Sequence, residues 1–155
     1  MKTWDEVYAH AREKCNICRC CPTCNGLACR GETPGPGGKG SGSAFVRNVE
    51  MLSKVFITMD TITSNEEVDT HADFFGHQVS MPVYAAPISG IRQNYGADMD
   101  DLVYTEELVK GCIDAGTIAF TGDGMYDDMF KGPLEILKKQ QGYGVPTIKP
   151  WAKEH

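Results

Sequence analysis

The segment from residue 83 onward alternates apolar runs with helical patterns, and this order constrains the fold more than any other feature. The apolar runs show no polar alternation, which is typical of strands that are covered on both faces. A strand–helix–strand–helix–strand order predicts a parallel sheet of α/β type. The expected strands occupy 83–87, 117–122 and 145–151, and the expected helices occupy 106–115 and 125–141.

The two expected helices differ in how well the sequence supports them. In the first, Leu108, Val109 and Cys112 recur at helical spacing and predict the face that packs inward, and Gly116 predicts its end. The second contains Pro133, which we expect to be tolerated only if a new segment begins there, because proline breaks a helix interior.

The length of the chain limits how much of a parallel fold it can build. A (β/α)8 barrel needs about 250 residues, whereas this chain has 155. The third expected strand comes close to the last residue, His155. We therefore expect the front part of a larger α/β fold, with about three of its strands.

The residues before position 83 predict a different set of elements. Thr3 and Glu6 form a capping box at the start of a helical pattern. The composition of 31–43, with six Gly and two Pro, excludes a regular element. The remaining expectations are a helix over 3–14, a helix over 44–54, a strand over 55–62, a hairpin over 72–82 that turns near Gly76, and a polar loop over 88–100.

Charge is unevenly distributed and excludes some classes of partner. The net charge is −6, and residues 59–128 carry 2 Lys and Arg against 14 Asp and Glu. An acidic middle without a basic stripe argues against nucleic acid or an anionic membrane as partner. The chain contains no run of 18 apolar residues, and its first residues include acids where a signal peptide is apolar. We expect a cytoplasmic protein whose cysteines are reduced or metal-bound.

Six cysteines within fifteen residues form a candidate metal site. Two sets of four have short spacings: Cys15, Cys18, Cys21 and Cys24, or Cys18, Cys21, Cys24 and Cys29. We prefer the second set, because the longer last spacing, with Gly26 in it, gives the fourth ligand room to turn back. Cys15 directly follows the first expected helix, so its backbone is less free.

The spacing leaves the identity of the metal open. Neither set matches the bacterial iron–sulfur run C-x2-C-x2-C-x3-C-P, and structural zinc sites usually separate two pairs by a dozen or more residues. Soft thiolates suit both zinc and iron–sulfur clusters. A reduced, cysteine-rich loop without metal is the alternative. The seventh cysteine, Cys112, is expected to be packed inside the fold.

From about residue 45, the chain resembles the FMN-dependent α-hydroxy acid oxidases and dehydrogenases, the glycolate and lactate oxidase family. The resemblance is an ordered series, and the cysteine segment lies outside it. Its most specific part is FFGHQVSMPVYAAP, in which F-G and a later proline precede an apolar strand and Ala-Pro. The series consists of AFVRNVEMLSKVFITMDTI, ADFFGHQVSMPVYAAPISG, EELVKGCIDAG and TIAFTGDG.

The resemblance implies the N-terminal portion of a (β/α)8 TIM barrel, preceded by a helix, a cysteine-rich loop and a β-hairpin. It divides the chain into 1–43 and a partial dehydrogenase barrel at 44–155. It implies FMN at the carboxyl ends of the strands. Two positions depart from the family: Gly122 stands where the family often has a serine, and Lys149 stands near a glutamine. The cofactor-binding residues implied are Ala86, Pro87, Ile88, Ser89, Thr121, Gly122 and Lys149.

The resemblance also implies an activity, the oxidation of a small 2-hydroxy acid to a 2-oxo acid. The family's His base, its substrate-binding Arg, its Lys near the flavin and its phosphate-binding loops are expected beyond His155. We therefore expect no catalytic residue on this chain and no turnover by it alone, and a missing C-terminal half or a homo-oligomer as partner. A cysteine centre that passes electrons on would favour a dehydrogenase. The alternatives are a metal-binding or iron–sulfur electron-transfer module and an inactive, truncated remnant.

Overall fold

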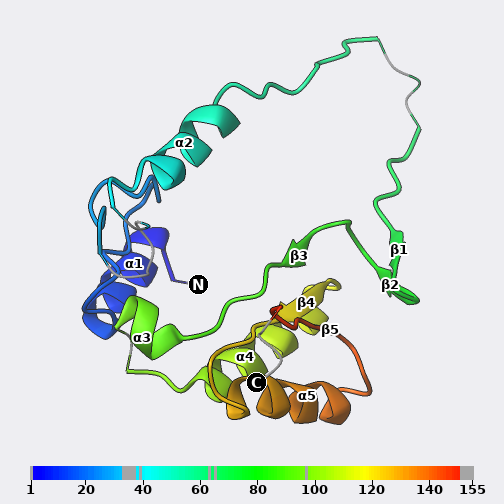
Figure 1. Ribbon diagram of the computed structural model, residues 1–155. Coiled ribbons are helices and arrows are strands. Elements are labelled where there is room, and N and C mark those ends of the chain that lie inside the picture. The colour runs from blue at the N-terminus through cyan, green and yellow to red at the C-terminus, as the bar shows by residue number, and fades with distance from the viewer. Residues whose placement is uncertain are drawn as a thin grey trace. The chain divides into compact units, whose positions relative to one another are not determined.

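The computed structural model describes residues 2–32, 38, 40–62, 64, 66–96 and 98–150 (Figure 1). The chain divides into two compact units. The first comprises Met1–Asn65 and Ile91–Asp98, and the second comprises Glu66–Gly90 and Met99–His155. The family-based division at residues 43 and 44 stays a prediction, because these units reflect contacts within the chain.

A three-stranded parallel sheet organises the second unit. Its strands are β3 (Tyr84–Ala85), β4 (Ile118–Thr121) and β5 (Val145–Pro146), in the order β3–β4–β5. Tyr84 pairs with Ile118 on one side of β4, and Phe120 pairs with Val145 on the other. The parallel α/β arrangement predicted from the sequence is confirmed for these strands, although β3 and β5 are shorter than expected.

Two helices pack on this sheet and bury its core. The helices are α4 (Asp101–Asp114) and α5 (Asp128–Lys139). The core consists of Val109, Cys112, Ala119, Ile136 and Leu137, with Leu108 partly buried against it. The predicted inward face of the first helix and the packed position of Cys112 are therefore confirmed.

Helix α4 begins five residues before the predicted start at 106, because Asp100 caps it. The Asp100 side chain accepts a hydrogen bond from the Leu102 N–H at 2.8 Å. The helix ends before Gly116, which has a φ of 69°. Capping therefore sets the start of the helix more strongly than its apolar periodicity does.

Helix α5 is continuous through Pro133, so the expected break at this residue is wrong. The Pro133 ring is buried within the unit. A side chain in place of the preceding Gly132 would collide with the Leu102 side chain of α4. The close approach of α4 and α5 thus holds the helix together across a residue that interrupts its hydrogen bonds.

The hairpin occurs where the sequence predicts it. Its strands are β1 (Ala72–Phe74) and β2 (His77–Val79). Phe75 and Gly76 between them have φ values of 52° and 80°, which is the backbone that a two-residue hairpin turn requires.

The sequence predicts that strand β3 is covered on both faces, but the structure leaves it partly exposed. Tyr84 is 50% exposed and Val83 is 60% exposed. The Tyr84 ring stacks on Phe74 and contacts Phe120, with ring centroids 5.6 and 4.8 Å apart. Aromatic side chains therefore cover one face of β3 only in part.

Three helices occur among the described residues of the first unit. They are α1 (Trp4–Lys14), α2 (Ser43–Leu52) and α3 (Ile91–Tyr95). The capping box predicted for α1 is confirmed, because Thr3 N–H donates to Glu6 Oε2 and Glu6 N–H donates to Thr3 Oγ1. Helix α3 lies within the segment predicted as a polar loop. Residues 33–37 and 39 of the Gly/Pro-rich segment 31–43 lie outside the described residues.

The strand predicted over 55–62 does not form. These residues lie in an irregular segment, and the side chain of Ile57 is 96% exposed. A strand needs a neighbour for its backbone hydrogen bonds, and no described segment pairs with this one. None of the described helices has the length and apolar character that crossing a lipid bilayer requires.

Replacing the cap of α4 tests how this helix is held. We expect Asp100→Ala to lower the free energy of unfolding by about 1 kcal/mol, because the Leu102 N–H loses its acceptor. Asp100→Asn keeps a side-chain oxygen and should unfold at nearly the parent urea concentration. Equal destabilisation by both variants would show that the cap is not the cause.

Candidate functional site

The carboxyl ends of β3, β4 and β5 lie at one edge of the sheet, because the three strands are parallel neighbours. The loop after β3 carries Ala86, Pro87, Ile88 and Ser89. Strand β4 ends at Thr121, and the segment after β5 carries Lys149. The residues that the resemblance implies for FMN therefore follow three adjacent strand ends.

Gly122 packs directly against the loop that follows β3. A Cβ atom at this position would collide with the backbone carbonyl of Ile88 and would come within 2.5 Å of the Ser89 side chain. Glycine is therefore required here by the close approach of two backbones, which explains the departure from the family's serine. Ile88, Ser89 and Gly122 are brought together.

Exposure divides the remaining predicted cofactor residues. Ala86, Pro87 and Lys149 are exposed at the edge of the sheet. Thr121 is 1% exposed, so its side chain is enclosed by the protein. The surface available to a ligand at this edge is therefore provided by the β3 loop and by the segment around Lys149.

The sequence analysis missed Asp123, a buried carboxylate at this edge. Asp123 is 3% exposed. Its Oδ1 accepts a hydrogen bond from Gly124 N–H at 2.8 Å, and its Oδ2 accepts one from Lys149 N–H at 2.8 Å. This side chain links the end of β4 to the segment after β5. The signal in the sequence was an acid that directly follows a buried strand, between two glycines.

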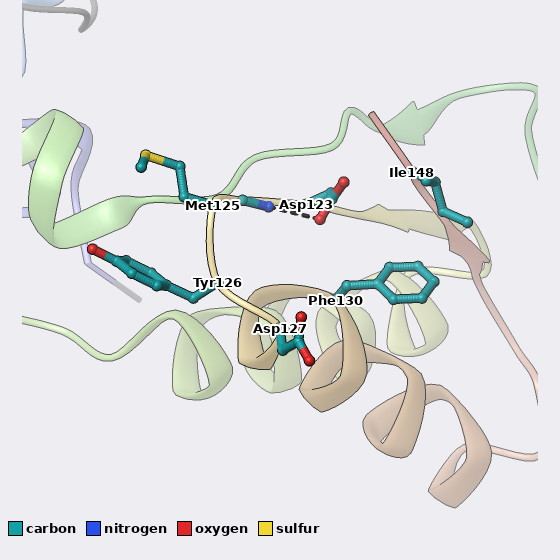
Figure 2. Close-up of a pocket in the computed structure, with 7 residues that line it drawn as sticks. Asp123, Met125, Tyr126, Asp127, Phe130 and Ile148 are labelled. Atoms are coloured by element: carbon teal, nitrogen blue, oxygen red, sulfur yellow. Dashed lines mark hydrogen bonds between the residues drawn. The ribbon is translucent and has the colours of Figure 1, made fainter. Parts of the chain in front are cut away.

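A cavity of about 210 Å³ lies beside Asp123 (Figure 2). Figure 2 shows Met125 and Tyr126 on the loop after β4, and Phe130 of α5 and Ile148 on the other side of the cavity. The lining thus combines apolar and aromatic side chains with two acids, Asp123 and Asp127. The lining residues are Asp123, Gly124, Met125, Tyr126, Asp127, Phe130 and Ile148.

The chemistry of this edge fits one part of a flavin better than another. Apolar and aromatic side chains beside exposed backbone suit a planar ring system. The charged residues that line the cavity, Asp123 and Asp127, are both acidic, and the hydrogen bond from Lys131 lowers the pKa of Asp127. The lining of the cavity contributes no cationic side chain for a phosphate, so the cavity fits the isoalloxazine better than the phosphate of FMN.

The cysteine segment lies in the first unit, where backbone hydrogen bonds attach it to α3. The Asn16 N–H donates to Gly96 O at 3.4 Å, and the Ile17 and Cys18 N–H groups donate to Tyr95 O at 3.1 Å. A Cβ on Gly96 would collide with the Asn16 side chain. The segment is therefore positioned by a helix that follows it by about 75 residues in the chain.

The thiol groups of this segment influence one another. Burial and then the charges of Cys18 and Cys15 raise the pKa of Cys20 to about 12. Burial and then Cys18 and Cys21 raise the pKa of Cys24. The pKa of Cys29 is also raised, by burial first and then by Cys24, Cys18 and other acidic groups. In the described part of the chain, no three His, Cys, Asp or Glu side chains are arranged to hold a metal ion.

Comparison with protein families identifies the chain. Residues 36–122 match the model of the FMN-dependent dehydrogenases. This match covers more than half of the sequence. The chain belongs to the FMN-dependent dehydrogenase family. Comparison with curated proteins and with solved structures found no match.

The family match covers most of the candidate site and none of the clustered cysteines. It contains the β3 loop, β4 and Gly122, whereas Lys149 and all six clustered cysteines lie outside it. Membership of this family makes the chain part of an FMN-dependent oxidoreductase family and implies a TIM barrel. The three parallel strands are compatible with that fold.

Substitution of Gly122 tests the close packing at the strand ends. We expect Gly122→Ser to lower the free energy of unfolding by about 1–3 kcal/mol, because the new side chain collides with the Ile88 carbonyl. The matched control is Gly111→Ser on exposed α4 surface, where no atom lies within 4 Å. It should change stability by less than about 0.5 kcal/mol. Similar urea unfolding curves for parent and Gly122→Ser would contradict the packing argument.

Proposed function

We propose that this chain forms one wall of the FMN site in a dehydrogenase that oxidises a small 2-hydroxy acid to a 2-oxo acid. The observation that carries the proposal is the convergence of Ile88, Ser89 and Gly122 at the ends of β3 and β4. These residues lie within the family match. The parallel strands are then the first three of a barrel.

Each part of the edge has a distinct role in this proposal. The backbone of 86–89 would hold the isoalloxazine, and Asp123 fixes the backbone of Lys149 by accepting its N–H. The exposed Lys149 side chain supplies a positive charge that stabilises negative charge developing on the ring. When bound, FMN accepts the electrons that leave the substrate. The residues that would bind the FMN phosphate lie outside the acidic cavity.

We further propose that Cys18, Cys21, Cys24 and Cys29 bind a thiophilic metal, either zinc or an iron–sulfur cluster. The support for this proposal is the short spacing of the four cysteines in the sequence, together with the backbone hydrogen bonds that attach residues 16–18 to the end of α3. Thiolates are soft ligands, so they favour zinc or an iron–sulfur cluster over hard cations such as magnesium or calcium.

The substrate is tested on the product of the complete reading frame that encodes these residues. We expect lactate or glycolate to bleach the absorbance of the FMN-loaded protein under anaerobic conditions. The control compound, 3-hydroxypropionate, has no hydroxyl beside its carboxylate and should leave the absorbance unchanged. Equal bleaching by all three compounds, or by none, would contradict the proposed substrate class.

The same preparation tests Lys149. Lys149→Gln should move the midpoint potential of bound FMN to a more negative value, because a positive charge is lost beside the ring. Lys139→Gln, at the end of α5, is the matched loss of charge and should leave the potential unchanged.

The ligand set of the metal is tested by anaerobic purification and metal analysis. Cys29→Ser should lose most of the metal found in the parent, and Cys15→Ser should keep it. Absorbance at about 400 nm would indicate an iron–sulfur cluster, since zinc thiolates are colourless. Loss with Cys15→Ser alone would select the other set of four, and a metal-free parent would remove the site.

A further inference from the structure

The loop that follows β3 ends at Gly90, which a carboxylate of α4 holds in place. The Gly90 N–H donates to Asp101 Oδ1 at 2.5 Å, and both residues belong to the second unit. Gly90 is buried, and its φ of 73° is one that residues with a side chain rarely adopt. A buried N–H needs an acceptor, and here the acceptor comes from a residue 11 positions further along the chain.

Helix α4 fixes the position of Asp101, which is the first residue of this helix. The Thr105 hydroxyl donates to the Asp101 carbonyl oxygen at 2.8 Å, and Thr105 is 4% exposed. One turn further along the helix, Val109 lies in the core of the unit. The backbone of Asp101 is therefore anchored in a packed helix, and such elements hold functional groups more precisely than loops do.

Two adjacent acids have different partners at this end of α4. Asp100 accepts a hydrogen bond from the Leu102 N–H of the helix itself, whereas Asp101 accepts one from the loop. The first interaction is an N-cap, which stabilises the helix. The second joins the helix to the loop, and a hydrogen bond to a carboxylate is stronger than one between neutral groups. Asp101 is therefore the acid that holds the end of the loop.

We propose that Asp101 is a positioning residue of the flavin site, a role that rests on the proposed function. The segment 86–89 begins at β3, where strand pairing fixes it, packs against Gly122 in its middle and ends at the residue bound to Asp101. Its backbone is therefore held in one conformation before FMN binds. A ligand that binds one conformation of a loop loses affinity as fewer molecules adopt that conformation. Asp101 thus acts on the affinity for FMN through the loop.

The affinity for FMN, measured on the product of the complete reading frame, tests this role. Asp101→Ala removes the acceptor of the buried Gly90 N–H. We expect the dissociation constant for FMN to rise about tenfold, which is the scale of one lost hydrogen bond to a charged group. Asp101→Asn keeps a side-chain oxygen at this position, so its dissociation constant should stay within about threefold of the parent value.

The matched control is Asp100→Ala, which removes the neighbouring acid and weakens the same helix without removing the acceptor of Gly90. It should keep the parent affinity for FMN at a temperature where all variants are folded, although it unfolds at a lower urea concentration. Equal loss of affinity in Asp100→Ala and Asp101→Ala would overturn the proposal, because the effect would then come from the stability of α4. Parent affinity in Asp101→Ala would overturn it as well.

Amide hydrogen exchange separates the hold on the loop from the proposed function, because it is measured without FMN. Asp101→Ala should speed exchange in a peptide that contains Gly90, whereas Asp100→Ala should leave that peptide at the parent rate. Unchanged exchange at Gly90 in Asp101→Ala would overturn the positioning role even where the parent binds FMN. A parent that binds no FMN would instead overturn the proposed function, and the role of Asp101 in it, whatever the exchange rates.

Discussion

Strand β4 is the element on which the second unit depends, because it is hydrogen-bonded on both sides. It pairs in parallel with β3 and β5, and α4 and α5 bury their apolar faces around its Ala119. Parallel pairing brings the carboxyl ends of the strands to the same edge. The contact of Gly122 with the Ile88 carbonyl and the link from Asp123 to Lys149 both follow from this arrangement. The candidate flavin edge is thus a consequence of strand pairing.

The first unit is held by hydrogen bonds more than by apolar burial. Helices α1 and α2 contain no buried residue. The cysteine segment is attached instead through backbone groups of 16–18 and 95–96, and the Arg19 guanidinium holds it locally by donating to Ile17 O. Three expectations stay predictions: a separate domain at 1–43, a cytoplasmic location and a homo-oligomer.

Local sequence signals predicted the elements that depend on neighbouring residues. The capping box of Thr3 and Glu6, the turn at Gly76 and the end of α4 before Gly116 each involve atoms within a few residues. The predictions that failed involve distant partners. The apolar segment 55–62 has strand propensity without a strand beside it, and Pro133 is accommodated in α5 because the packing against α4 stabilises the helix. Helix α3 lacks the length at which periodicity becomes visible.

By itself, the sequence determined the parallel α/β order after residue 83, the family and the strand ends that carry the candidate cofactor residues, because these follow from periodicity and short motifs. Only the tertiary structure decided which groups meet at those ends. It explained why residue 122 is glycine, since another backbone occupies the space of a side chain. It also revealed Asp123, whose partner Lys149 is 26 residues away, because contact between distant residues depends on how the backbone folds and not on spacing alone.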